Sequence, residues 1–177
     1  MPKLSDEQKE TRRRQIVEAA WRCIDRKGVA ATSMDEIIAE CGMSAGAVYL
    51  YFPGKDALVA AAMTASFVAL SAELAPLLGR AQNLTAEAFL TEAAALIERF
   101  SKREGYDLRR VAIHGWSQAL IDPELQAIQR DFYATIEAAL APLAARWKPF
   151  SADLLLALLL GNTVKAALLD RPRQRRR

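Results

Sequence analysis

The chain has few of the residues that build disulfides or metal sites. Its 177 residues include two cysteines and one histidine, and no Cys-x-x-Cys pair occurs. This inventory is too small for a structural zinc site, and neither a metal nor a cofactor is expected. Cys23 and Cys41 fall on helix faces that we expect to point inward. Both are predicted to be buried thiols in a reducing cytoplasm, with a redox switch as the alternative.

Signals for secretion and membrane insertion are also missing. The N-terminus is charged and polar, unlike a signal peptide. The apolar run from Leu154 to Leu160 is shorter than the roughly 20 residues that cross a bilayer. We therefore expect a cytoplasmic protein without a membrane partner. No clear strand-like alternation occurs, and apolar residues recur at helical spacing, so the fold class is predicted to be all-α.

The body of the chain lacks an excess of positive charge. The formal net charge is +3, but five arginines lie in the last seven residues, 171–177, and without them the charge becomes −2. Bulk charge therefore does not indicate nucleic-acid binding, and the distribution of charge matters more. The basic tail 171–177 is predicted to be disordered, serving solubility or a loose, salt-sensitive attraction to DNA.

The segment from Gly28 to Leu58 carries the most informative local pattern. Ser33 and Glu36 have the spacing of a capping box that opens a short helix. Gly42 suits a tight turn, since glycine tolerates the left-handed conformation, and Ser44 is a good cap for a second short helix. These features predict two helices joined by a tight turn, the layout of a helix-turn-helix that reads the major groove of DNA.

The residues of this segment resemble the TetR family of transcriptional regulators. The resemblance covers about residues 12–60. It rests on Ile16-Val17-x-Ala19-Ala20, Gly28, Thr32-Ser33, Ile37-Ile38, Gly42-Met43-Ser44-x-Gly46-x-x-Tyr49-x-Tyr51-Phe52 and Lys55-x-x-Leu58. The resemblance implies a helix-turn-helix DNA-binding domain over 1–54 and a helical effector-binding and dimerisation domain over 55–170. It further implies that effector binding shifts the fourth helix and moves the two DNA-binding domains of a dimer apart.

Helix-capping residues and helix-breaking glycines and prolines divide the rest of the chain into helices. The expected helices cover about 5–28, 33–40, 44–51, from 55 to a proline kink or stop at 76–79, 85–100, 107–121, 123–147 and 151–169. The last helix is leucine-rich on nearly every side up to Leu160, and such a helix is normally buried. A partner subunit is the expected cover, so the last two helices are predicted to form a four-helix bundle across a two-fold axis.

The predicted DNA contacts all lie within the first 55 residues, the head of the chain. They are Arg13, Thr32, Ser33, Ser44, Ala45, Gly46, Ala47, Tyr49, Leu50, Tyr51 and Lys55. Lys55, Tyr49 and Tyr51 are phosphate candidates, and one or two of the three consecutive arginines at 12–14 are expected to join them. The second helix has no charge and no Asn or Gln, so strong bidentate readers of bases are missing. We expect modest specificity per half-site, with DNA shape and dimer spacing supplying the rest.

The second half of the chain is expected to enclose a small apolar or aromatic effector. The candidate lining residues are Phe67, Phe89, Phe100, His114, Trp116, Phe132 and Tyr133, each of which also suits an ordinary core. No catalytic constellation occurs, so an enzyme is not expected. The sequence thus predicts a dimeric repressor released from a palindromic operator by its effector, although an activator would look the same. The alternative is a helical interaction module of the same shape that has lost specific DNA binding.

Overall fold

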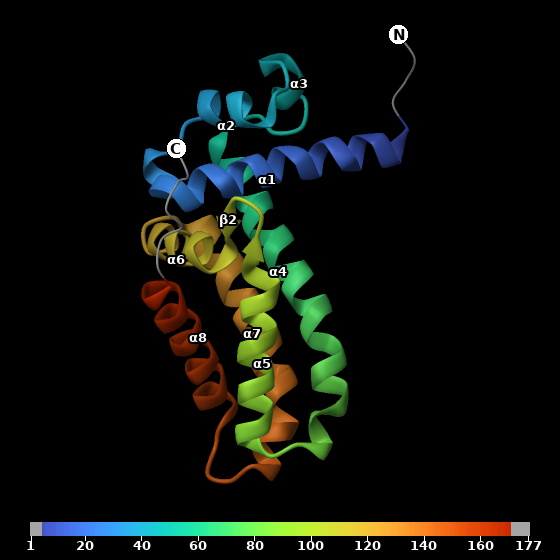
Figure 1. The fold of residues 1–177 in the computed structure, drawn as a ribbon, viewed down its shortest axis with the longest axis vertical. Coiled ribbons are helices and arrows are strands. Elements are labelled where there is room, and N and C mark those ends of the chain that lie inside the picture. The colour runs from blue at the N-terminus through green and yellow to red at the C-terminus, as the bar shows by residue number, and fades with distance from the viewer. Residues whose placement is uncertain (1–4, 171–177) are drawn as a thin grey trace. The chain divides into compact units, whose positions relative to one another are not determined.

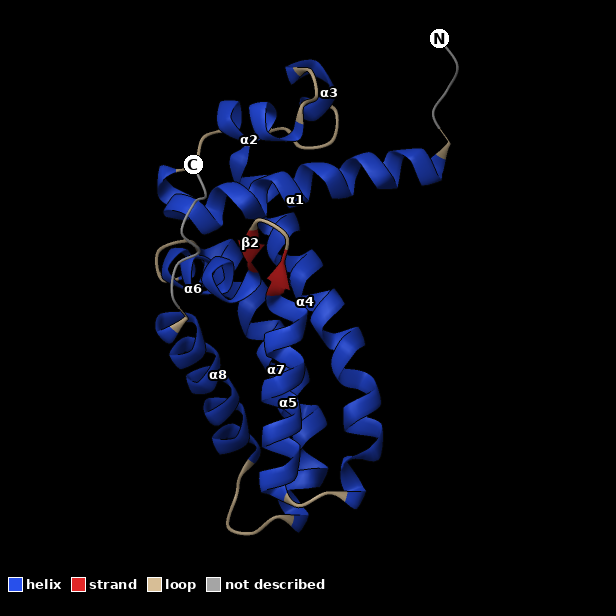
Figure 2. Cartoon of the chain, viewed as in Figure 1, coloured by secondary structure: helices blue, strands red, loops and turns tan. Residues whose placement is uncertain are grey.

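The computed structural model describes residues 5–170 and is all-α apart from one small hairpin (Figures 1 and 2). Within this range there are eight α-helices and a single turn of 3-10 helix, Ala81–Asn83. The described residues pack into two compact units, one that contains 5–67 and 103–129 and another that contains 68–102 and 130–170. The predicted fold class is confirmed.

The first unit contains the helix-turn-helix. Its helices are α1 (Asp6–Ala31), α2 (Met34–Cys41), α3 (Ala45–Tyr49), the first half of α4 (Lys55–Arg80) and α6 (Leu108–Ala119), followed by the start of α7 (Pro123–Arg146). Ile16, Ala20 and Cys23 of α1 pack with Ile37, Val48 and Phe52 in one buried cluster. A second cluster joins the end of α1 to α4 and α6 through residues such as Ile24, Val59 and Met63. These clusters fix the short helices to α1, which they need because isolated helices of this length are unstable in water.

The predicted helix starts are confirmed by their caps. Ser5 with Gln8 and Ser33 with Glu36 form reciprocal capping boxes. Asp122 accepts from the backbone N–H groups of Glu124 and Leu125 at 3.0 and 3.2 Å, which opens α7 at Pro123 as expected. Each cap satisfies an N–H group that the helix itself leaves without a partner.

Gly28, the predicted end of the first helix, breaks the regular geometry of α1 three residues before the final residue. Its φ of 83° and ψ of 169° lie in a region that essentially only glycine adopts, and the helix resumes through Ala31. A Cβ atom at this position would lie 3.1 Å from Nδ1 of His114 on α6. Gly28 therefore serves both a backbone bend and the close approach of the sole histidine.

The second unit has its own core. It contains the rest of α4, α5 (Ala86–Ser101), most of α7 and α8 (Ala152–Leu169). Phe89, Leu140, Trp147 and Leu155 are buried together, and the indole N–H of Trp147 donates to the Leu84 carbonyl at 3.1 Å. Neither Pro76 in α4 nor Pro142 in α7 ends its helix. α5 and α8 pack side by side (Figure 1).

A short β-hairpin was missed by the sequence reasoning, which expected only a break at Gly105. Strands β1 (Lys102–Arg103) and β2 (Tyr106–Asp107) pair across Gly105, whose φ is 87°. The strands are too short for alternation to show in the sequence. Asp107 then caps α6 and holds the buried guanidinium of Arg109, whose Nε lies 3.0 Å from Oδ1. A buried arginine requires such a charged partner.

The apolar character of α8 has two possible explanations, a membrane-spanning helix or a core helix. By length and composition, α8 and the segment 55–83 are each apolar enough to cross a membrane, with a mean hydropathy of 1.7. Core helices of soluble proteins pass the same test. Leu155 and Leu159 of α8 lie in the core of the second unit, so one side of the helix already packs against protein. On the other side of α8, Leu154, Leu158, Leu168 and Leu169 are exposed, so this part of its apolar surface lacks cover from the described residues.

The compact units differ from the predicted domain division. α6 and the first half of α4 pack with the N-terminal helices rather than with the second unit. The predicted boundary between residues 54 and 55 is a division by function, which this packing does not test. The predicted basic tail 171–177 lies outside the described residues.

We predict that Gly28→Ala destabilises the protein by about 1–3 kcal/mol, because an alanine at this φ and ψ is strained and its Cβ crowds His114. Gly79→Ala is the matched control: it lies in α4 with open space around its Cβ position and is expected to gain roughly 0.5–1 kcal/mol. Urea denaturation of both variants measures the difference. Equal midpoints for the two would show that the bend at Gly28 is not required.

Candidate DNA-binding site

The helix-turn-helix has the geometry expected from its sequence. Gly42 ends α2 in the left-handed conformation with a φ of 69°, which reverses the chain toward α3. Ser44 begins α3 by accepting from the N–H of Ala47 at 3.3 Å. Ile37 and Val48 are fully buried, so the two helices are held by their inner faces and the outer face of α3 is free.

Most predicted reading residues lie on the exposed side. Ser44, Ala45, Gly46, Tyr49 and Leu50 are exposed, and Leu50 is 86% accessible to solvent. α3 itself ends at Tyr49, two residues earlier than expected, and Leu50 caps it. An apolar side chain this exposed on a rigid helix has no packing role within the chain, which favours a contact with a partner.

Two predicted reading residues are only half-exposed. Ala47 is partly covered, and Tyr51 packs against the cluster that contains Val48 and Phe52. The tyrosine thus contributes to the core of the head, and its ring is less available to DNA than that of Tyr49, which is 46% exposed.

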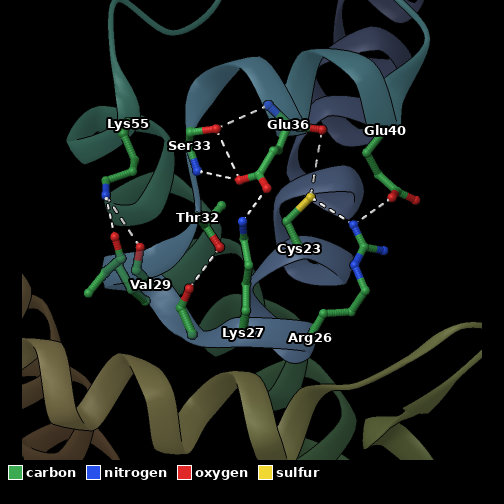
Figure 3. A network of polar contacts seen from close by, with 11 residues as sticks. Cys23, Arg26, Lys27, Val29, Thr32, Ser33, Glu36, Glu40 and Lys55 are labelled. Carbon is green, nitrogen blue, oxygen red and sulfur yellow. Dashed lines mark hydrogen bonds and ion pairs between the residues drawn. The ribbon is translucent and has the colours of Figure 1, made fainter.

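A network of ion pairs anchors α2 to α1 (Figure 3). Lys27 pairs with Glu36, and the Ser33 N–H donates to the same carboxylate at 2.9 Å. Farther along α2, Glu40 accepts from Nε of Arg22 at 2.9 Å and from Arg26 at 2.7 Å. The hydrogen bond from Lys27, together with those from Ser33, lowers the pKa of Glu36 to about 2. Three basic side chains of α1 are thereby engaged within the head.

Cys23 lies inside this network (Figure 3). Its Sγ accepts from Arg26 at 3.2 Å, and burial raises the pKa of the thiol. A thiol with a raised pKa is a poor nucleophile, which agrees with the expected buried structural role. Cys41, predicted to be buried, is only half-buried.

Thr32 and Lys55 are also engaged within the chain (Figure 3). The hydroxyl of buried Thr32 donates to the Gly28 carbonyl at 2.7 Å, so its predicted contact with phosphate is disfavoured by this geometry. Nζ of Lys55 donates to the carbonyls of Val29 and Ala30 at 3.3 and 3.4 Å. An ammonium group has three donors, so Lys55 can hold the end of α1 and still face an anion.

Two of the three consecutive arginines of α1, Arg12 and Arg13, lie in different surroundings. The guanidinium of Arg13, the predicted DNA contact, lies 4.9 Å from the centre of the Phe52 ring and forms a cation–π contact. Arg12 instead lines a groove of about 690 Å³ with Ser44 and Ala47, and Arg22 lies farther along it. The sequence reasoning did not single out Arg12, although its spacing from Gln15, Glu18 and Arg22 marks one polar face of the helix.

The predicted effector residues are divided between the two units. Phe67, His114 and Trp116 belong to the first unit, and Phe67 and Trp116 line a cavity there. Phe89 is core in the second unit, 5.3 Å from the Trp147 ring, and Phe132 packs on the same core beside Tyr133. Phe100 also lies in this unit and is half-buried. Phe89 therefore fits the alternative stated for these residues, namely that they belong to an ordinary hydrophobic core.

Two short helices joined by a glycine turn, with the second helix exposed, define a DNA-binding helix-turn-helix protein. Residues 16–62 match the family described as bacterial regulatory proteins, tetR family. The N-terminal segment is therefore that of a tetR-family helix-turn-helix, and curated relatives such as BetI of Vibrio parahaemolyticus are named as HTH-type transcriptional regulators.

Relatives extend this likeness beyond the head. The regulator PksA of Bacillus subtilis (strain 168) is 46% identical over 63 residues, 36% of this chain and 30% of the relative. The chain spans 30% or less of the first curated relatives that it matches. BetI of Burkholderia thailandensis is 29% identical over 180 residues, 97% of this chain and 89% of the relative. A solved TetR-family structure from Streptomyces coelicolor A3 is 25% identical with a TM-score of 0.68, covering 92% of this chain and 91% of that one.

We predict that Glu36→Gln lowers stability at neutral pH and that this loss shrinks as the pH falls from about 4.5 toward about 2. The sign follows from the lowered pKa of Glu36: the ionised carboxylate stabilises the fold above the usual pKa, and this contribution disappears on protonation. Thermal denaturation of both proteins across this range measures it. Asp35→Asn, in the same turn but outside the network, is the control. A constant difference between wild type and Glu36→Gln would contradict the prediction.

Proposed function

We propose that the protein is a cytoplasmic, dimeric repressor that binds a palindromic operator and is released by a small apolar or aromatic effector. The observation that supports this most is the exposed outer side of α3, whose inner side is fixed to α1 by the buried cluster of the head. A surface of methyl groups, hydroxyls and backbone suits the floor of the major groove, where thymine methyls and acceptors are displayed.

In this proposal, phosphate contacts give affinity and α3 gives orientation and limited base reading. Tyr49, Arg12 and Lys55 contact phosphates, and the Ser33 and Ser44 hydroxyls lie where the backbone passes. Ala45, Gly46 and Leu50 meet base edges, with Ala47 at the margin of the contact. Arg13 and Tyr51 support the head from inside, and Thr32 holds the bend at Gly28. Such a surface reads few bases strongly, so operator shape and half-site spacing contribute the remaining specificity.

Dimerisation through α7 and α8 follows from their exposed faces. Leu154, Leu158, Gly161, Lys165 and Leu168 are all exposed and follow one another at intervals of three or four residues along α8. On α7 the exposed residues at similar spacing are alanines, at 134, 138, 141 and 145. Small residues let helices approach closely, and a leucine stripe supplies apolar surface to bury. A two-fold pairing of these faces gives a four-helix bundle.

The effector acts by binding one arrangement of the subunit better than the other. A ligand shifts an equilibrium only by its difference in affinity for the two states. α4 runs from Lys55 in the first unit into the second unit, so it is the element through which an effector changes the spacing of two heads. The sign of regulation depends on where the operator lies, and repression is the simpler outcome of occupying a promoter.

The alternative is an interaction module of the same fold that has lost specific DNA binding, which the charge-free α3 favours. Selection of bound duplexes from a random pool separates the two. A palindromic consensus supports the repressor, whereas the absence of enrichment at low salt supports the module. Ala47→Lys adds a positive charge beside α3 and is expected to strengthen binding to all sequences. A uniform loss of binding would show that this face does not meet DNA.

We predict that Arg12→Gln reduces the slope of log affinity against log salt concentration by about 0.9, the value for one lost phosphate contact. Arg14→Gln removes the same charge from the neighbouring position, which does not line the groove beside Ser44 and Ala47, and is expected to change the slope less. Titration of an operator duplex at several salt concentrations measures both slopes. Equal slopes for the two variants would show that Arg12 makes no phosphate contact that Arg14 lacks.

We predict that Leu158→Glu makes the protein monomeric and weakens operator binding by roughly a hundredfold or more, because the two heads no longer bind as a linked pair. Leu158 is 42% exposed, so helical content measured by circular dichroism is expected to persist. Leu120→Glu is the control, since Leu120 is also exposed but lies in the turn after α6. Sedimentation equilibrium measures the mass of each variant. A dimeric Leu158→Glu protein would place the subunit contact elsewhere.

A further inference from the structure

We propose that a cavity in the first unit, between α1, α4 and α6, binds a small apolar molecule that carries one hydrogen-bond acceptor. The acceptor is received by the indole N–H of Trp116. The regulatory consequence of this site rests on the proposed function, but binding itself does not. The site names the chemical class of effector and places it in the same unit as the reading head.

The cavity is built almost entirely from apolar side chains. Its walls include Trp21, Ile24, Val59, Met63, Phe67 and Trp116. Its volume of about 30 Å³ exceeds the roughly 10–15 Å³ that one water molecule needs. The hydroxyl of Ser66, which also lines it, already donates to the Met63 carbonyl at 2.8 Å. Apolar walls disfavour a charged or strongly polar occupant.

Trp116 supplies the one polar feature that points to a ligand. Its Nε1 is buried and makes no hydrogen bond with any of the described residues. The other two tryptophans differ: Nε1 of Trp21 donates to the Ala62 carbonyl at 3.2 Å, and that of Trp147 donates to Leu84. Buried indole N–H groups normally find a partner, because leaving one without an acceptor is costly. A ligand with a carbonyl or ether oxygen would remove that cost.

A molecule larger than water enters this space only if its walls move. Met63 is the most adaptable wall, since its side chain is flexible and its Cε lies 3.2 Å from where a Cβ at Gly115 would be. The cavity also touches Ile24 and Val29 near the end of α1 and Val59 on α4. These residues join α1 to α4 and α6 in a buried cluster. Ligand binding is therefore coupled to the packing that holds the head together, which is how an effector would act on it.

The test uses cyclohexanone and methylenecyclohexane, which have nearly the same shape but differ in the presence of an acceptor oxygen. Proton–nitrogen NMR of the full-length protein reports three indole N–H resonances, one for each tryptophan. We expect cyclohexanone to shift the Trp116 resonance downfield, as a new hydrogen bond does, while the Trp21 and Trp147 resonances move little. Methylenecyclohexane is expected to leave the Trp116 resonance without a downfield shift.

Trp116→Phe provides the energetic test. It keeps an aromatic wall and removes the N–H, so it is expected to weaken cyclohexanone binding roughly threefold to tenfold, the effect of one neutral hydrogen bond, without lowering thermal stability. Trp147→Phe, the matched control, removes a donor of the second unit that already has an acceptor and is expected to lower stability while leaving ketone affinity unchanged. The proposal is overturned if both probes shift the Trp116 resonance alike, if neither does, or if nuclear Overhauser contacts show a persistent water on its N–H.

The outcome is separate from that of the proposed function. Ketone binding that depends on Trp116 but leaves operator affinity unchanged supports the site and contradicts its role in DNA release. Operator binding by a protein whose Trp116 resonance ignores the ketone supports the repressor and overturns the site.

Discussion

The head of this protein depends on a single packing constraint: two helices of eight and five residues have to be held against a longer one. Helices this short do not persist alone, because the cost of forming the first turn exceeds the few hydrogen bonds that follow. Ile37, Val48 and Phe52 fasten them to α1 in one apolar cluster. The position of α3, and thus any reading of DNA, is a consequence of that contact rather than of helical propensity.

Ion pairs add direction to this apolar contact. Apolar burial alone does not fix how one helix turns about its axis, because the effect is largely non-directional. Glu36 and Glu40, one turn apart on α2, meet Lys27, Arg22 and Arg26 of α1. Such partly exposed pairs contribute little to stability individually, but their geometry fixes the register between the two helices. The head is in this sense held by apolar contact and aligned by charge.

The parts of the structure that the sequence predicted best are those encoded locally. Caps at Ser33, Ser44 and Asp122 and the turn at Gly42 each require only a few neighbouring residues, and each was predicted correctly. The strands of the hairpin around Gly105 are too short for an alternating pattern to show. The contacts of Arg12 and Arg13 depend on residues distant in sequence, such as Ser44 and Phe52. The engagement of Thr32 and Lys55 within the chain likewise depends on the bend at Gly28. The scattered aromatic residues proposed as one pocket fall in two units, because their spacing gives no information on which core each one joins.

The internal use of basic side chains in the head has a consequence for how such a protein searches a chromosome. Lys27, Arg22 and Arg26 are neutralised by carboxylates of α2, and α3 carries no charge. Non-specific affinity for a duplex grows with the number of cations that face it, and a genome offers a vast excess of such competing sites. A head that neutralises these three cations internally attracts a duplex less at wrong positions. In the proposed dimer, modest discrimination by each α3 then suffices, since occupancy depends on the ratio between correct and background binding and not on the strength of either alone.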